Sequence, residues 1–215
     1  MTTHVWVLSV AAAVTALLSW GAVLRGEYEV ERITRPTFVV LVLGLAWSLY
    51  PDGRPVDDSV ALPLFVALTL ALLADVLLLT ATALRYRLAL VVIVVSHTAL
   101  IRAVLDLPVG GAFPWAVIPT VASLVVVHGA LGRHVVRLAG RDRALVLLTH
   151  VVTMSLVVIA SARGDWMVLA AAVLLLVSSL VFGHDRFVRE QRFAPVQAVA
   201  TCQVAQVLIV VGLLR

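Results

Sequence analysis

The sequence has no lysine, one cysteine and very little charge. All 16 of its basic residues are arginines, and charged residues make up only 13% of the chain. The single cysteine, Cys202, excludes an intrachain disulfide framework. Soluble domains carry about twice this share of charged residues, because those residues cover the surface that faces water. These shortages exclude a soluble globular enzyme.

What the chain has instead is apolar residues, which make up 62% of its 215 residues and give a mean hydropathy of +1.10. A stretch of about 17–25 apolar residues can cross a bilayer as a helix. We therefore predict an all-α, polytopic integral membrane protein with a single transmembrane domain over residues 1–215. Its eight helices are expected near residues 4–24, 36–50, 60–84, 88–106, 114–132, 144–162, 166–184 and 196–214. Because no arginine precedes the first run, we interpret it as a retained helix rather than a signal peptide.

The arginines are distributed unevenly between the two sides of this predicted bundle. Twelve of the 16 fall in the segments after the first, third, fifth and seventh helices. Loops rich in arginine stay on the cytoplasmic side. This distribution predicts a multi-pass protein of the cell membrane with both termini outside the cytoplasm.

One acidic residue, Asp75, lies inside the apolar run 62–79. A charged side chain at the centre of a bilayer costs about 2.5–3.5 kcal/mol on insertion scales. A chain therefore retains such a residue where it faces a partner, a watery cavity or a substrate. The alternative is a structural hydrogen bond or ion pair between helices. With the third helix ending near residue 84, Asp75 is expected about ten residues from its cytoplasmic end.

Further polar residues fall at similar depths in other helices. His97 and His150 are expected in the cytoplasmic halves of the fourth and sixth helices, Gln206 near the middle of the eighth, and Asp185 at the end of the seventh. Together with Asp75 they indicate a polar cavity that opens toward the cytoplasmic leaflet. Each histidine alone could equally be a neutral residue that joins two helices.

A weak internal repeat accompanies these residues. Asp75 precedes His97 by 22 positions and Asp185 precedes Gln206 by 21, each time across an arginine-rich turn. Four helices followed by four would begin both halves on the same side of the membrane. The chain could therefore consist of two parallel four-helix repeats.

Three chemical readings of the polar residues stay open. Two carboxyl groups in unlike surroundings can divide acid and base roles, with Asp75 as acid and Asp185 as base. The same acids with His97, His150 and His184 could form an oxygen–nitrogen metal site, although no HxxxH pair fixes two ligands on one helical face. Asp75 could also be the proton site of a small transporter. No GxSxG or phosphate-binding loop indicates another chemistry.

The order of short motifs along the chain resembles the YhhN family of membrane lysoplasmalogenases. Members have a Lys-Pro that opens the second helix, a Gly-Asp in the third, a His-x-x-Tyr in the fourth, a Ser-Asp that ends the seventh and a Tyr-Tyr-x-x-Gln in the eighth. The corresponding segments here are Arg35-Pro36, Ala74-Asp75, Ser96-His97-Thr98-Ala99-Leu100, His184-Asp185 and Cys202-Gln203-Val204-Ala205-Gln206. The acids, the histidine and the last glutamine are kept, while the tyrosines are replaced.

This resemblance implies a hydrolase that cleaves the vinyl-ether bond of a lysoplasmalogen to a fatty aldehyde and a glycerophospho-alcohol. It would use no organic cofactor, and its partners would be a lysophospholipid-type substrate and the bilayer. The expected catalytic residues are Asp75, Asp185 and His97. The expected substrate-binding residues are Arg35, for the phosphate, with Gln206 and His184. A metal-dependent lipid hydrolase and a proton-coupled transporter remain the alternatives.

Overall fold

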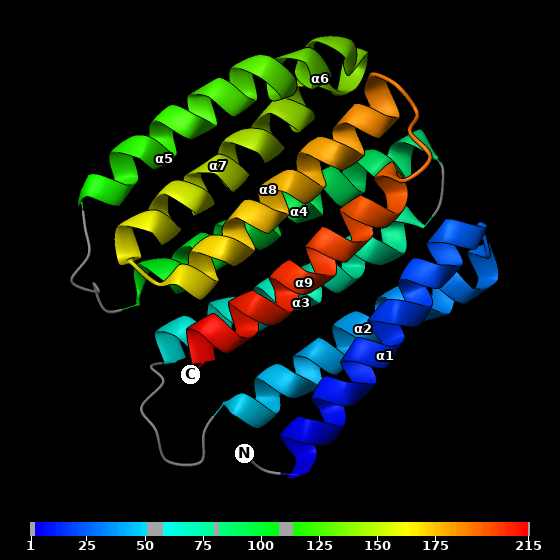
Figure 1. Ribbon diagram of the computed structural model, residues 1–215, viewed down its shortest axis with the longest axis vertical. Helices are drawn as coiled ribbons and strands as arrows, with labels where there is room; N and C mark the ends of the chain where they lie inside the picture. Colours follow the sequence, from blue (N-terminus) through cyan, green and yellow to red (C-terminus); the bar gives the residue numbers. More distant parts are fainter. Residues whose placement is uncertain (1–2, 51–57, 80–81, 108–113, 215) are drawn as a thin grey trace.

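The computed structural model describes residues 3–50, 58–79, 82–107 and 114–214, and helices form nearly all of this part of the chain. Figure 1 shows how they are arranged. In chain order they are α1 (Thr3–Arg25), α2 (Tyr28–Leu49), α3 (Asp58–Leu78), α4 (Ala83–Leu105), α5 (Pro114–Val127), the π-helical segment η1 (His128–Gly132), α6 (Arg133–Leu138), the 3-10 turn η2 (Gly140–Asp142), α7 (Arg143–Arg163), α8 (Trp166–Phe187) and α9 (Ala194–Leu214).

Eight helical stretches in the described residues are long and apolar enough to cross a membrane, as the hydropathy pattern predicts. The fifth of them, Val117–Leu138, combines α5, η1 and α6 into one span. Large apolar side chains such as Trp6, Leu17 and Val125 face outward. An outward apolar surface is what a bilayer requires, because backbone polar groups are already paired within the helices. The all-α, polytopic fold is therefore confirmed.

The helices lie side by side along a shared direction, with α1 and α2 at one edge and α5 to α7 at the other (Figure 1). Helix α3 packs extensively on α4, and α8 packs extensively on α9. The contact of α4 with α7 likewise corresponds to the contact of α9 with α2. These pairings are the ones that two parallel four-helix repeats would make, although the repeat itself stays a prediction.

The arginine-rich connections all lie at one end of the bundle. The α1–α2, α6–α7 and α8–α9 connections, the last turn of α3 and the first turn of α4 share this end, whereas α1 begins and α9 ends at the opposite end (Figure 1). The structure thus brings together the arginines that the sequence assigns to one side. We call this the arginine-rich end. Its placement in the cytoplasm remains the prediction of the charge rule.

Helix α2 is longer than the apolar run that predicts it. It begins at Tyr28 rather than near residue 36, so Pro36 lies inside the helix and not in its first turn. The two added turns carry charged residues, which hydropathy assigns to a loop, and Glu31 and Arg35 pair there across one helical turn. The predicted start of the second helix near residue 36 was therefore wrong.

The turn between α3 and α4 also comes earlier than predicted. Helix α3 ends at Leu78 instead of near residue 84, and α4 begins at Ala83 instead of near 88. Tyr28 supports this position by donating a hydrogen bond from its hydroxyl to the carbonyl of Leu79. The sequence from 76 to 84 contains only apolar residues and two threonines and lacks glycine and proline, so composition alone does not reveal the turn. In the fifth span, helix continues through α6 to Leu138, beyond the predicted end at 132.

Small residues let α8 and α9 approach closely where they form one wall of the bundle interior. A Cβ atom on Gly212 of α9 would lie 2.9 Å from Cγ2 of Val168 in α8. Close approach at small residues is a common mode of helix packing in membranes. This contact lies at the end of the pair away from the arginine-rich end.

Candidate functional site

A cavity of about 320 Å³ penetrates the bundle between α3, α4, α8 and α9, with contributions from α2 and α7. Its lining begins at the arginine-rich end with Glu31 and Asp185 and reaches Leu100 and Ile209 inside the bundle. Most of the wall is apolar, and polar side chains come from every one of these helices. A long, mostly apolar cavity with a few polar groups suits a small amphiphilic ligand.

The best-defined polar group in the cavity is an ionic cluster of Arg35, Glu31 and Asp75. The Arg35 guanidinium donates to Oε1 of Glu31 at 2.9 Å and to Oδ1 of Asp75 at 3.0 Å. The three side chains are 13%, 20% and 14% exposed, respectively. Charges this far removed from water need partners, and here one cation is shared by two carboxylates. The cluster joins α2 to the end of α3.

Asp75 is therefore shallower than the sequence indicates. Because α3 ends at Leu78, Asp75 lies in its last turn, where its carbonyl accepts from the amide of Leu79. The expected depth of about ten residues from the helix end was wrong. Asp185 lies correspondingly in the last turn of α8. Both acids line the cavity near the arginine-rich end.

His97 lies deeper, on α4, in a chain of hydrogen bonds that leads to α7. Its Nδ1 is 2.9 Å from Oγ1 of Thr153, and that hydroxyl donates its only proton to the carbonyl of Thr149 at 2.8 Å. Thr153 can then only accept from the ring, which assigns the proton of the neutral imidazole to Nδ1. Nε2 is left as an acceptor, and no described residue forms a hydrogen bond with it.

The face of α9 toward the cavity carries two glutamines with different surroundings. Oε1 of Gln203 accepts from the indole of Trp20 at 2.7 Å, which ties α9 to α1. Nε2 of Gln206 lies 3.8 Å from Sγ of Cys202, while its Oε1 is buried and has no hydrogen-bond partner among the described residues. Buried polar atoms are rarely left unpaired, so Gln206 presents an unused acceptor at the cavity wall.

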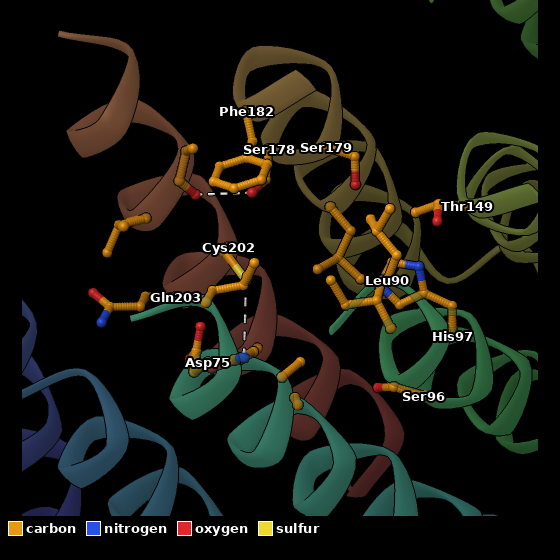
Figure 2. Close-up of a pocket in the computed structure, with 18 of the residues that line it drawn as sticks. Asp75, Leu90, Ser96, His97, Thr149, Ser178, Ser179, Phe182, Cys202 and Gln203 are labelled. Atoms are coloured by element: carbon orange, nitrogen blue, oxygen red, sulfur yellow. Dashed lines mark hydrogen bonds between the residues drawn. The ribbon is translucent and has the colours of Figure 1, made fainter. Parts of the chain in front are cut away.

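Figure 2 places these groups relative to one another. Asp75, Cys202 and Gln203 lie at one side of the view, and His97 with Thr149 lies at the other. Ser178, Ser179 and Phe182 of α8 lie above the space between them. The cavity thus presents a carboxylate and an imidazole from different directions. A ligand between them would meet both.

The predicted site residues are largely brought together. Arg35, Asp75, His97, Asp185 and Gln206 all line the cavity, whereas His184 is not part of its lining. Instead, Nδ1 of His184 lies 3.3 Å from Nε2 of Gln191. The backbone amide of Gln191 also donates to Oδ1 of Asp185 at 2.8 Å, which orients that carboxylate.

Sequence reasoning missed three residues of this site. Glu31 could have been predicted, because it lies four residues before Arg35, which is the spacing of a helical ion pair. Thr153 and Tyr86 had no signal, because their partners lie far along the chain. Tyr86 lines the cavity and carries the Arg186 guanidinium over its ring, 3.8 Å from the centroid.

The donor set that could have formed a metal centre is dispersed. Among the residues that the structure describes, no three His, Cys, Asp or Glu side chains lie close enough together to hold one ion. His150 illustrates why. Its ring contacts that of His128 edge-on, with centroids 5.7 Å apart, rather than facing His97 or an acid, and its Nδ1 has no partner in the described part of the chain.

Fold and cavity together define a small polytopic helical membrane protein whose mostly apolar cavity carries polar and charged side chains near the arginine-rich end. The chain matches the profile of the YhhN family over residues 30–213 and belongs to that family. The match runs from the first turn of α2 through nearly all of α9 and leaves α1 outside it. Neither the curated proteins nor the solved structures compared with the chain include a match.

Proposed function

We propose that this protein is a membrane-embedded hydrolase that cleaves the vinyl-ether bond of a lysoplasmalogen. The observation that carries the proposal is that one mostly apolar cavity is lined by both Asp75 and Asp185. An ether with one hydrocarbon chain and a polar head matches such a cavity. Family membership supports a hydrolase-like role, and the residues at the cavity supply the acid and base that this reaction needs.

The reaction divides into proton transfers that two carboxyl groups can perform. Protonated Asp75 donates to the vinyl carbon remote from oxygen, and the carbon bonded to oxygen becomes part of an oxocarbenium ion. Water adds to that carbon and gives a proton to Asp185, forming a hemiacetal. The hemiacetal hydroxyl returns its proton to Asp75, Asp185 protonates the departing glycerol oxygen, and the aldehyde is released. Positioned acids and bases of this kind each accelerate reactions by about 10²–10⁴-fold.

Arg35 has a double role in this proposal. It bonds Asp75 in the structure, but a guanidinium is also the preferred partner of a phosphate. A substrate phosphate that binds Arg35 would take over this contact and leave Asp75 without its cation, able to hold the proton that it donates. Substrate binding would thus prepare the acid. Glu31, which stays on Arg35, would hold the guanidinium in place during the exchange.

The remaining polar groups would position water and the intermediate. His97 offers Nε2 as an acceptor while Thr153 fixes its ring, and Gln206 offers its unpaired Oε1. Acceptors directed at a developing oxocarbenium ion stabilise it in the way that an oxyanion hole stabilises negative charge. Asp185, which the Gln191 amide orients, would then act as the base near the arginine-rich end.

The test is aldehyde release from a lysoplasmalogen by the purified full-length protein. We expect turnover in the wild type and a loss of about 10²-fold or more in Asp75→Asn and Asp185→Asn. Asp58→Asn is the matched control, because Asp58 begins α3 at its far end and does not line the cavity. No aldehyde from the wild type would refute the proposal for this substrate.

Two further experiments distinguish the proposed hydrolase from a metal-dependent hydrolase and from a transporter. Turnover that disappears after treatment with a chelator and returns with added metal would favour the metal-dependent hydrolase. Movement of a substrate across proteoliposomes without conversion would favour a proton-coupled transporter that uses Asp75. The proposed mechanism requires conversion that a chelator does not affect.

A further inference from the structure

A second concavity lies on the opposite side of α7 from the cavity. It is a groove of about 880 Å³ between α5, η1 and α6 on one side and α7 on the other. No residue that lines it also lines the cavity. The groove is therefore separate from the cavity proposed for hydrolysis, and its own chemistry has to be explained.

Three arginines lie along the groove near the arginine-rich end. Arg133, Arg137 and Arg143 all line it and are exposed. None of them forms an ion pair with a described residue. Asp142, which precedes Arg143, is already bound to Arg87 at 2.6 Å. The groove thus carries positive charge that the described part of the protein does not neutralise.

Below the arginines the groove becomes apolar. Its lining on α7 runs from Arg143 to Ile159, which corresponds to about 24 Å of helix at 1.5 Å per residue. Half of a bilayer's hydrocarbon core is about 15 Å thick. The apolar part, which includes Val125, Val151 and Val158, is therefore long enough to follow an acyl chain through one leaflet.

The groove wall has an uncommon backbone. Residues His128–Gly132 form a π-helical turn, a feature that is frequent at functional sites. The His128 ring folds over Gly132 so closely that any Cβ at Gly132 would collide with it. This arrangement keeps His128 at the groove, beside the arginines, and widens the helix there.

From these features we propose that the groove binds an anionic phospholipid. The phosphate is held by Arg133, Arg137 and Arg143, and one acyl chain lies along the apolar wall of α7. A guanidinium cluster is complementary to a phosphate, and the apolar wall below it is complementary to a chain. This site would give a preference for negatively charged lipids of the same leaflet that the arginine-rich end contacts.

Native mass spectrometry of the purified full-length protein can measure this preference. The probes are phosphatidylglycerol and phosphatidylcholine with identical chains. We expect phosphatidylglycerol to bind at least tenfold more tightly. The triple variant R133Q/R137Q/R143Q should lose most of this difference.

The matched control removes the same charge elsewhere at the arginine-rich end. Arg32, Arg141 and Arg189 are exposed and do not line the groove, so R32Q/R141Q/R189Q should keep the preference. If both triple variants lose it equally, diffuse surface charge is the cause and the proposal is wrong. Because all six arginines are exposed, both triple variants should fold. Arg137→Gln alone should lose a smaller part of the preference for phosphatidylglycerol.

Two more measurements separate a lipid from a simple anion. Val151→Trp should fill the apolar wall and weaken phosphatidylglycerol binding at least fivefold while the arginines stay in place. Unchanged affinity in this variant would contradict a bound acyl chain. Glycerol phosphate should bind far more weakly than phosphatidylglycerol, and equal affinity would identify the groove as a site for soluble anions and overturn the proposal.

Discussion

The ionic cluster of Arg35, Glu31 and Asp75 predicts an asymmetry between two substitutions. Arg35→Gln leaves two carboxylates at the cavity wall without a cation. Asp75→Asn removes one charge but keeps an oxygen that can still accept from Arg35, which also retains its bond to Glu31. The arginine variant should therefore be much less stable than the asparagine variant.

The exposure of the three side chains sets how much stability each substitution should cost. A hydrogen bond to a charged group contributes about 1.5–3 kcal/mol, and breaking a buried ion pair costs about 3–5 kcal/mol. Since these side chains retain 13–20% exposure, the lower limit applies. We expect a loss in the free energy of unfolding of about 3 kcal/mol for Arg35→Gln and about 1 kcal/mol for Asp75→Asn. For a chain of this length these losses lower Tm by about 6–12 °C and about 2–4 °C.

Thermal unfolding of the purified protein in detergent measures both shifts. The control is Arg25→Gln, whose side chain is 75% exposed and whose pair with Glu27 should contribute less than about 1 kcal/mol. The double variant Arg35→Gln/Asp75→Asn should be more stable than Arg35→Gln alone, because one of the two orphaned carboxylates is gone. Equal shifts for the two single variants, or a larger one for Asp75→Asn, would refute the shared-cation arrangement.

Two further predictions concern the hydrogen-bond chain and the π-helical turn. Thr153→Val should lower turnover about tenfold or more, because His97 loses the acceptor that fixes its ring, and Thr153→Ser should restore most of it. Equal activity of both variants would contradict a role for this hydrogen bond in turnover. Gly132→Ala should lower Tm because its Cβ would collide with the His128 ring, whereas Gly129→Ala, which has open space, should have little effect. Thermal unfolding distinguishes the two variants. Equal shifts in Tm would contradict the close approach of the His128 ring to Gly132.

Hydropathy predicted the number and order of the membrane helices because each apolar run is separated from the next by charged or turn-forming residues. It failed where that contrast is missing. The segment 76–84 has no charged residue, glycine or proline, so the end of α3 at Leu78 could not be seen, and Asp75 was placed too deep. The charged first turns of α2 were assigned to a loop for the opposite reason.

The members of the site were easier to predict than their contacts. A polar residue inside an apolar run stands out in the sequence because its burial in a membrane costs free energy. This feature identified Asp75, His97 and Gln206. Their partners depend on packing between distant segments. Arg35 and Asp75 are 40 residues apart, and the hydrogen bond from His97 to Thr153 spans 56 residues. No local pattern encodes such pairs, so the ion pair of Arg35 with Asp75 was not predicted.

The central claim is that a vinyl ether is protonated on carbon and hydrolysed in the cavity. The most direct measurement is the deuterium content of the aldehyde that the purified protein releases from a lysoplasmalogen in D₂O. Proton transfer from an exchanged acid predicts one deuterium on the carbon next to the carbonyl, at a rate that Asp75→Asn lowers about 10²-fold or more. Release of an unlabelled aldehyde, or labelled release that Asp75→Asn leaves unchanged, would contradict the account.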